Sequence, residues 1–328
     1  MMLRREFITL LGGAAAWPLA AWAQQAAIPV IGVLGSGSRS TFEFALAAFM
    51  QGLRQQGYIE DRNVTIQYSW ADGHYDLLPS MADEFVRRHV AIIVTFQGTI
   101  TAEAAKAATS NIPIVFALGT DPVAAGLIAA LNRPGRNLTG ATDLAVELGP
   151  KRLGLLHDLL PSVTTIGTLI NPANPTAGNA RLTLIETAAA NFGIRVYPAS
   201  VGSDHDLDPA FETLMKMGAG ALLVGSDPFH VSRRERIVSM AARIRMPTLY
   251  SQSEYVKAGG LMSYGPRSTD IFMIVGDYAG RILKGTKPAD LPVVQPSKFE
   301  FVINLQTART IGIDVPPTLR ALADEVIE

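Results

Sequence analysis

Short apolar runs and longer amphipathic runs alternate along most of the chain. Residues 28–34 are almost all apolar over the length of a buried strand. In residues 41–57, apolar side chains recur every three or four positions as far as Gly57, which predicts a helix and its end. Repeated strand-then-helix units are typical of an α/β protein with parallel sheets.

The alternation runs through two successive series. The first predicts strands at 28–34, 64–68, 90–95, 112–117 and 138–142, and helices at 41–57, 77–88, 101–109 and just after Asp121-Pro122. The second predicts strands at 165–170, 194–198, 221–225, 247–250, 260–264 and 299–303, and helices at 144–160, 177–192, 209–217, 232–245, 270–284, 307–312 and 317–327. Two series without a linker between them predict two apposed lobes. We expect ligands at the carboxyl ends of the strands, in a cleft between the lobes.

The first 23 residues have the pattern of an export signal. The pair Arg4-Arg5 precedes an apolar run at 8–21, and a small-x-small cleavage pattern ends at Ala23. The run is shorter than the about 20 residues that a spanning helix needs. The arginine pair resembles a twin-arginine signal, and a Sec signal is the alternative. The sequence therefore predicts a signal peptide at 1–23 and a mature chain from Gln24.

Composition narrows the function classes. The 28 Lys and Arg against 29 Asp and Glu give a net charge of −1, without the basic excess that nucleic-acid binding requires. The chain of 328 residues contains no cysteine, which excludes thiolate zinc sites, iron–sulfur clusters and cysteine nucleophiles. It also leaves no lipid-attachment residue after the signal. We expect an unlipidated monomer in the periplasm, with no metal, cofactor or nucleic-acid partner.

Several motifs then resemble one family from end to end. They are Asp121-Pro-Val-Ala-Ala-Gly-Leu127, Asn137-Leu-Thr-Gly140, Tyr255-Val-Lys-Ala-Gly-Gly-Leu-Met-Ser-Tyr-Gly265, Phe299-Glu-Phe-Val-Ile-Asn-Leu305 and Ala323-Asp-Glu-Val-Ile-Glu328. The chain resembles ABC-transporter substrate-binding proteins, in the group whose members bind aromatic amino acids such as tryptophan. The resemblance implies a type I periplasmic-binding-protein fold, with two Rossmann-like lobes of parallel sheets joined by three hinge crossovers. It also implies a small-molecule ligand and an ABC permease in the inner membrane as partner.

The resemblance places the crossovers near Asp143, Gly265–Arg267 and Pro292–Ser297. The predicted helix at 270–284 then returns to the first lobe. The resulting division is 24–142 plus 266–292 for lobe 1, and 143–265 plus 293–328 for lobe 2.

Loops after the predicted strands supply candidate ligand contacts. The resemblance assigns a ligand carboxylate to Gly98, Thr99 and Thr120, with helix capping as the alternative role of the hydroxyls. The other polar candidates in such loops are Ser36, Ser38, Gln97, Asn171, Asn174 and Ser226.

Asp227 is the expected partner of a ligand ammonium group, and N-capping of the following helix is its alternative role. Pro228 follows it where tryptophan-binding relatives carry a polar residue, so the ligand type stays open. Tyr250 and Tyr264 end predicted strands and are expected to form the wall of the cleft.

These observations predict a solute-binding protein rather than an enzyme. The expected ligand is a small carboxylate-bearing solute, either an amino acid or an aromatic compound. An exported sensory receptor with the same fold is the alternative. An α/β hydrolase is less well supported, because the chain has no Gly-x-Ser-x-Gly elbow and no histidine pair at helical spacing.

Overall fold

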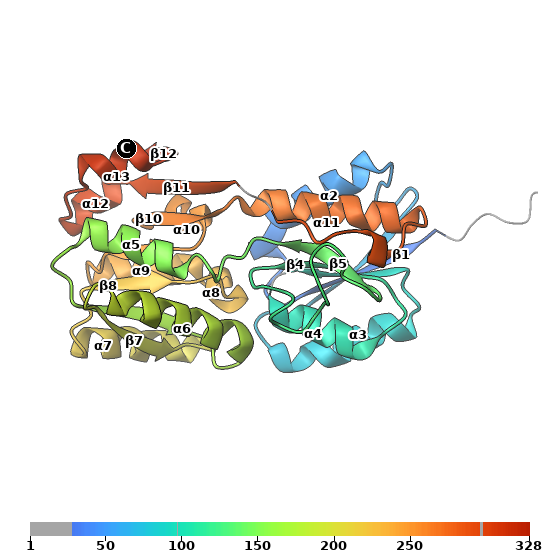
Figure 1. The fold of residues 1–328 in the computed structure, drawn as a ribbon, viewed down its shortest axis with the longest axis horizontal. Helices are drawn as coiled ribbons and strands as arrows, with labels where there is room; N and C mark the ends of the chain where they lie inside the picture. Colours follow the sequence, from blue (N-terminus) through green and yellow to red (C-terminus); the bar gives the residue numbers. More distant parts are fainter. Residues whose placement is uncertain (1–27, 97, 296–297) are drawn as a thin grey trace, which may run out of the picture.

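Two α/β units lie side by side along the long axis of the molecule (Figure 1). The structure is a computed structural model that describes residues 28–96, 98–295 and 298–328. The predicted signal peptide at 1–23 and the candidate Gln97 lie outside the described residues, and both stay predictions. Among the helices of the described part, none is long and apolar enough to cross a membrane.

The first unit is built on a five-stranded parallel sheet in the order β2-β1-β3-β4-β5. Its strands are β1 (Val30–Gly35), β2 (Thr65–Trp70), β3 (Ile92–Phe96), β4 (Ile114–Leu118) and β5 (Leu138–Thr142). Its helices are the 3-10 turns η1 (Ser40–Phe42) and η2 (Tyr75–Leu77), with α2 (Glu43–Gln55), α3 (Leu78–Arg87) and α4 (Thr99–Ala108). Every residue of β3 and β4 is buried, as expected for strands covered on both faces.

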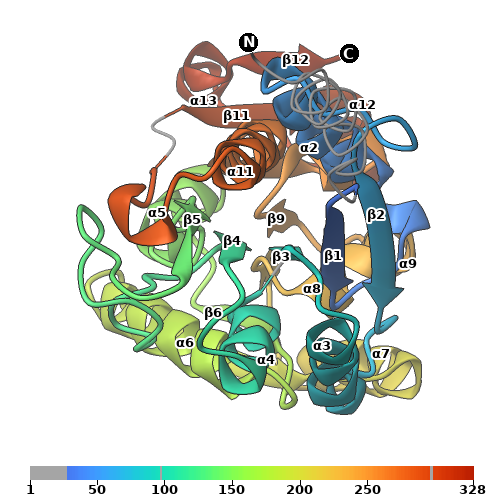
Figure 2. The same ribbon diagram turned by 90° about the vertical axis from the view of Figure 1, so that its right-hand side faces the viewer.

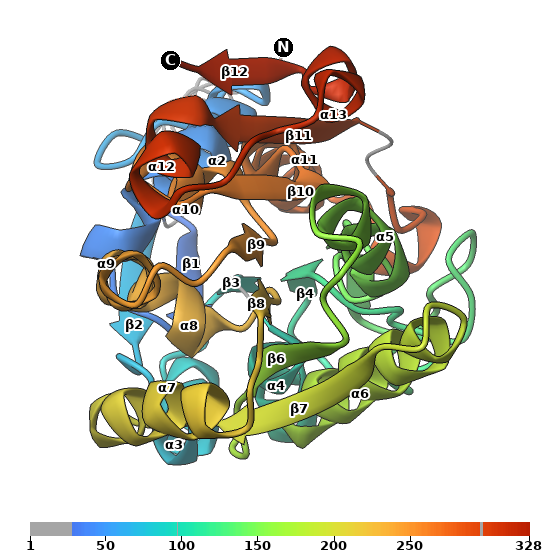
Figure 3. The same cartoon turned by 90° about the vertical axis from the view of Figure 1, so that its left-hand side faces the viewer.

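The second unit is built on a seven-stranded sheet in the order β12-β11-β10-β9-β8-β6-β7 (Figure 3). Its strands are β6 (Thr165–Ile170), β7 (Arg195–Ser200), β8 (Ala221–Val224), β9 (Thr248–Tyr250), β10 (Met262–Pro266), β11 (Phe299–Asn304) and β12 (Glu325–Ile327). Its helices are α5 (Gly149–Leu159), α6 (Pro175–Ala190), η3 (Asp204–Asp206), α7 (Leu207–Lys216), α8 (Pro228–Ser232), α9 (Arg234–Arg243), α10 (Ser253–Lys257), α12 (Leu305–Ile311) and α13 (Pro317–Leu322).

The chain passes between the two sheets three times, which confirms the three predicted crossovers. The first passage follows β5, and the second leads from β10 into α11 (Ser268–Leu283). The third leads from the turn η4 (Pro288–Asp290) and Val294, which still bridges Ala141 of β5, to β11. The two units are therefore connected by three separate segments of the chain.

Helix α11 returns to the first unit and covers one face of its sheet together with α2 (Figure 2). Helices α3 and α4 cover the opposite face. Glycines allow α2 and α11 to touch, because a Cβ atom at Gly52 would lie 2.1 Å from the carbonyl oxygen of Met273. The body of α11 is thereby packed closely against α2.

The second sheet is not wholly parallel, which corrects one expectation. Strand β11 runs antiparallel to β10, and Phe299 at its start pairs with Pro266 at the end of β10. The direction reverses because the third passage brings the chain in from the first unit. Strand β11 therefore starts beside the carboxyl ends of the parallel strands.

Three predicted helical segments differ from the structure. Residues 122–127 form turns in which the Asp121 carboxylate accepts from the N–H groups of Val123 and Ala124. The helix predicted from 144 starts only at Gly149, because Leu144 has a left-handed φ of 48°. The end of the predicted helix 317–327 is strand β12, because Asp324 pairs through its N–H and its carboxylate with Phe301.

Candidate functional site

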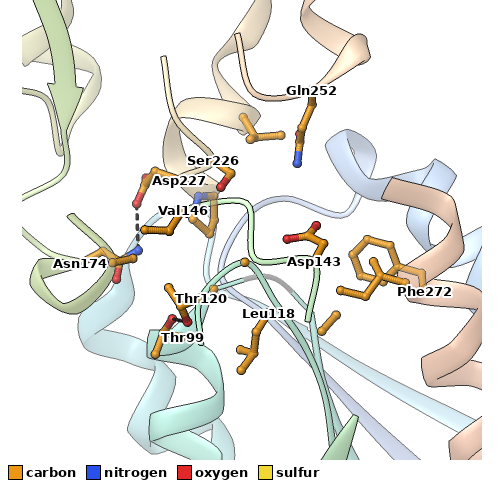
Figure 4. Close-up of a pocket in the computed structure, with 17 residues that line it drawn as sticks. Thr99, Leu118, Thr120, Asp143, Val146, Asn174, Ser226, Asp227, Gln252 and Phe272 are labelled. Atoms are coloured by element: carbon orange, nitrogen blue, oxygen red, sulfur yellow. Dashed lines mark hydrogen bonds between the residues drawn. The ribbon is translucent and has the colours of Figure 1, made fainter. Parts of the chain in front are cut away.

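A pocket lies between the two units, where loops from the carboxyl ends of several parallel strands meet (Figure 4). The first unit contributes the loops after β3, β4 and β5 and the start of α11, and the second contributes those after β6, β8 and β9. About 560 Å³ of space among the lining residues is free of protein atoms, part of it continuous with solvent. The position agrees with the rule that open α/β sheets bind ligands outside the carboxyl ends of their strands.

Two threonine hydroxyls lie at one end of this pocket. Thr99 Oγ1 and Thr120 Oγ1 are 2.6 Å apart, and both residues are buried and line the pocket. Neither caps a helix with its side chain, because Gly98 occupies the N-cap of α4 and Thr120 precedes a turn. Gly98 has a φ of 91°, which favours glycine. The pair therefore faces the pocket at the N-terminal end of α4.

Asp227 lies at the same pocket from the opposite unit and has several hydrogen-bond donors of its own. Its carboxylate accepts from the amides of Asn171 and Asn174 and from the N–H of Phe229, each at 3.0 Å. The hydroxyl of Tyr75 adds a longer contact of 3.4 Å. The bond to Phe229 caps α8, so the predicted capping role of Asp227 is confirmed.

The charge of Asp227 is stabilised inside the protein. Burial acts to raise the pKa of this carboxyl, but His230, the two asparagine amides and Arg181 together hold the pKa below its usual value. The side chain is only 2% exposed. Asp227 is therefore an ionised, buried group whose hydrogen-bond partners are already supplied by the chain.

A second carboxylate, Asp143, faces the pocket from the first crossover. Burial raises the pKa of Asp143 to about 7, and the N–H of Ala145 and the more distant Arg152 offset this effect only in part. The N–H of Ala145 donates to Oδ1 at 3.1 Å. The sequence had identified Asp143 only as a crossover position. Its place directly after a predicted strand was the signal that could have marked it as a pocket residue.

Ser226 and Gly119 adjoin this carboxylate. The Ser226 hydroxyl is buried and has no hydrogen-bond partner among the described residues. A Cβ atom at Gly119 would lie 3.4 Å from Ser226 Oγ and 3.6 Å from Asp143 Oδ1. The absence of a side chain at Gly119 thus leaves space between the two polar groups.

Apolar side chains form much of the remaining wall. Leu118 is the last residue of β4, Val146 belongs to the first crossover, and Ile271 and Phe272 belong to the first turns of α11. Gln252 adds an amide that points into the pocket in Figure 4. The sequence missed these residues, because periodicity predicts α11 without showing that its first turns face the other unit.

Tyr250 and Tyr264, which were expected to form the wall of the cleft, do not line the pocket, and this expectation is corrected. The Tyr250 ring stacks on Tyr255 of α10 at 4.6 Å, and the Tyr264 ring stacks on Phe299 at 6.1 Å. Both rings are held by neighbours within the second unit. The position of a residue at a strand end did not indicate to which face of the sheet its ring points.

Six of the predicted residues meet at the pocket, and the other predicted residues that the structure describes do not line it. The six are Gly98, Thr99, Thr120, Asn174, Ser226 and Asp227. Asn171 supports Asp227 from behind the pocket. Ser36 is buried outside the lining, and Ser38 hydrogen-bonds to Thr41 at 2.7 Å beside η1.

The chain is similar to a protein named for its ligand and to two solved structures. Over 284 residues it is 27% identical to a tyrosine-binding protein of Clostridioides difficile, covering 86% of this chain and 81% of the relative. A Streptococcus pneumoniae ABC domain solved in complex with L-Trp is 27% identical, with a TM-score of 0.81 over 91% of this chain and 99% of that one. A conserved domain protein of Vibrio cholerae is 29% identical, with a TM-score of 0.83 and the same coverage.

These structural similarities confirm the type I periplasmic-binding-protein fold that the sequence predicted. The model of the ABC transporter substrate binding protein family matches residues 31–327, which is nearly the whole described chain. The chain therefore belongs to the family of ABC transporter substrate-binding proteins.

Proposed function

We propose that the protein is the periplasmic component of an ABC uptake system and binds a small carboxylate-bearing solute, an amino acid or an aromatic compound. Support comes from the family and from relatives described as tyrosine-binding or solved with L-Trp. The export pattern at 1–23 supports a periplasmic location, and the family supports an inner-membrane permease as partner. The solute is carried and not converted.

The observation that carries this proposal is the hydroxyl pair at the start of α4. The first N–H groups of a helix have no intrahelical partner, and the helix dipole places partial positive charge there. Thr99 and Thr120 present hydroxyls at the same point. A carboxylate bound here would accept from a hydroxyl and from backbone N–H groups, as anions do at helix N-termini.

The apolar wall suits the rest of such a solute. Leu118, Val146 and Phe272 line the pocket, and Phe272 lies across it from the threonine pair. Ligand pockets are commonly lined by apolar and aromatic side chains, with few polar groups that fix orientation. An aliphatic or aromatic side chain would be buried against this wall while its carboxylate is held at α4.

The units supply opposite sides of the pocket, so ligand binding stabilises their approach. We propose that lobe 1 (24–142 plus 266–292) and lobe 2 (143–265 plus 293–328) move about the three crossovers. A ligand that contacts both lobes binds the closed arrangement more tightly than the open one and shifts the equilibrium toward it. The closed monomer would then engage the permease.

A thermal-shift screen of the mature protein tests this function. Amino acids and aromatic acids, including L-tryptophan and L-tyrosine, are added at rising concentration, because a ligand of the native state raises the melting temperature. We expect at least one carboxylate-bearing compound to raise it in a saturable way. A shift with sugars or metal ions, and with none of the carboxylates, would overturn the proposal.

A further inference from the structure

Two carboxylates face the pocket, and they differ in the number of hydrogen-bond partners that the chain supplies. Asp227 accepts three hydrogen bonds at 3.0 Å and a fourth contact at 3.4 Å, and it caps α8. These donors come from both units, and they satisfy most of the acceptor sites that a carboxylate offers. Asp227 therefore organises the floor of the pocket without needing a ligand cation.

Asp143 has far fewer partners. Its one hydrogen bond between described groups is the N–H of Ala145 to Oδ1, and no ion pair among the described residues includes it. The buried cation whose charge acts on Asp143 is Arg152, and its guanidinium donates to the carbonyl oxygens of Ala145 at 2.6 Å and Tyr264 at 2.7 Å. A partly desolvated carboxylate with a single neutral donor lacks the partners that a buried charge requires.

An unpaired hydroxyl lies next to this carboxylate. Ser226 Oγ is buried, lines the pocket and has no partner among the described residues. It approaches Gly119 from the second unit, while Asp143 approaches Gly119 from the crossover. In Figure 4 the Asp143 carboxylate and the Gln252 amide point into a different part of the pocket from the Thr99 and Thr120 hydroxyls.

We propose that Asp143 and Ser226 form the subsite that binds the ammonium group of the solute. An ammonium group has three donors, and the Asp143 carboxylate and the Ser226 hydroxyl offer acceptors beside the space left by Gly119. Asp227 then positions the pocket rather than pairing with the ligand cation. This subsite rests on the proposed function, because the carboxylate of the same solute is bound at Thr99 and Thr120.

The subsite has a consequence for specificity. A plain carboxylic acid would occupy the threonine end and leave the Asp143 carboxylate without a cation. A site built to hydrogen-bond a polar group rejects analogues that lack it, because its own buried groups stay unpaired. The protein should therefore select amino acids over the corresponding desamino acids.

Isothermal titration calorimetry with three matched probes tests the subsite. The probes are L-tryptophan, 3-(indol-3-yl)propionate, which lacks the ammonium group, and tryptamine, which lacks the carboxylate. The variants are Asp143→Asn and Ser226→Ala, and the control is Asp121→Asn, a loop carboxylate near Gly119 that does not line the pocket. Melting temperatures confirm that each variant folds.

We expect wild type and Asp121→Asn to bind tryptophan at least tenfold more tightly than indolepropionate. Asp143→Asn should weaken tryptophan at least tenfold and leave indolepropionate within threefold of wild type. Ser226→Ala should weaken tryptophan less than Asp143→Asn does. Calorimetry in buffers of different ionisation enthalpy should show proton release when tryptophan binds to wild type at pH 7, and none with Asp143→Asn.

The outcomes separate the subsite from the proposed function. If indolepropionate binds as tightly as tryptophan, or if Asp143→Asn keeps the preference for tryptophan, the subsite is wrong while a carboxylate solute stands. If neither acid binds, this aromatic carboxylate class is wrong. In that case tryptamine tests the subsite. Binding of tryptamine to wild type that is lost in Asp143→Asn supports the subsite, and a failure of tryptamine to bind to wild type overturns it.

Discussion

The hydroxyl of Tyr75 accepts a hydrogen bond from the backbone N–H of Phe229 at 3.0 Å. Tyr75 belongs to η2 of the first unit, and Phe229 belongs to α8 of the second. The same hydroxyl contacts the Asp227 carboxylate at 3.4 Å. One side chain therefore connects the first unit to the capped end of α8 beside the pocket, and it would stabilise the closed arrangement that we propose.

Replacing Tyr75 with Phe should weaken ligand binding without removing a ligand contact, because Tyr75 does not line the pocket. Loss of the hydroxyl leaves the buried Phe229 N–H with one acceptor fewer, at a cost of about 1 kcal/mol to the closed form. We expect a Kd about fivefold higher and a faster dissociation rate, measured by calorimetry and stopped-flow fluorescence. Tyr197→Phe, on β7 at the edge of the second sheet, is the matched control. Equal Kd values for the two variants would show that the bridge does not support closure.

Gly119→Ala should fill the space between the two polar groups of the pocket. The added Cβ would lie 3.4 Å from Ser226 Oγ and 3.5 Å from Ala145 Cβ, which is ordinary contact that the fold tolerates. We expect affinity for an amino-acid ligand to fall at least tenfold while the melting temperature changes little. Gly154→Ala is the control, because a Cβ there meets nothing within 4 Å on a helix. Unchanged affinity in Gly119→Ala would exclude this part of the pocket from ligand contact.

Asp143→Asn should stabilise the ligand-free protein, and more so at alkaline pH. The pKa of Asp143 is raised from 3.8 to about 7, with burial as the largest cause and the neighbouring Glu147 adding to it. The folded state therefore binds a proton that the unfolded state releases between these values, so this group costs stability progressively as pH rises toward 7. The cost is fully present at pH 8 and small at pH 4.5.

The expected result is a melting temperature that is a few degrees higher in Asp143→Asn than in wild type at pH 8, with a smaller difference at pH 4.5. Gly154→Ala carries no titratable change and should show the same difference from wild type at both values. Scanning calorimetry of the ligand-free proteins measures both. A variant that is less stable than wild type at pH 8 would mean that Asp143 is a stabilising group of the hinge and not one held for a ligand.

Local patterns predicted much of the fold. The strands at 138–142 and 165–170 have the predicted bounds, because short apolar runs there are closed by polar or turn-forming residues. The reversed direction of β11 and the strand at 325–327 were not visible in the sequence. Both depend on where a distant segment brings the chain, and the pairing of Asp324 with Phe301 overrides the helical pattern of the tail.

The candidate site was predicted only in part, for a related reason. The rule that ligands bind after parallel strands located Thr99, Thr120 and Ser226 correctly at the pocket. This rule could not show that Asp227 already accepts several hydrogen bonds while Asp143 accepts only one among the described residues, because these bonds depend on how distant segments come together. Aromatic lining came from Phe272 on the returning helix, and no local pattern relates that position to the pocket.

The proposed function depends most on a ligand carboxylate bound at the hydroxyl pair of Thr99 and Thr120. Calorimetry of Thr99→Val with the tightest-binding carboxylate ligand from the screen tests this binding most directly. Valine preserves shape and removes the hydroxyl that lies 2.6 Å from Thr120. Thr187→Val, an exposed threonine on α6 that bonds only its own helix, is the control. We predict a loss of affinity of at least tenfold, about 1.4 kcal/mol, in Thr99→Val and none in Thr187→Val. Equal affinity in both variants, with both folded, would contradict a carboxylate bound at this pair.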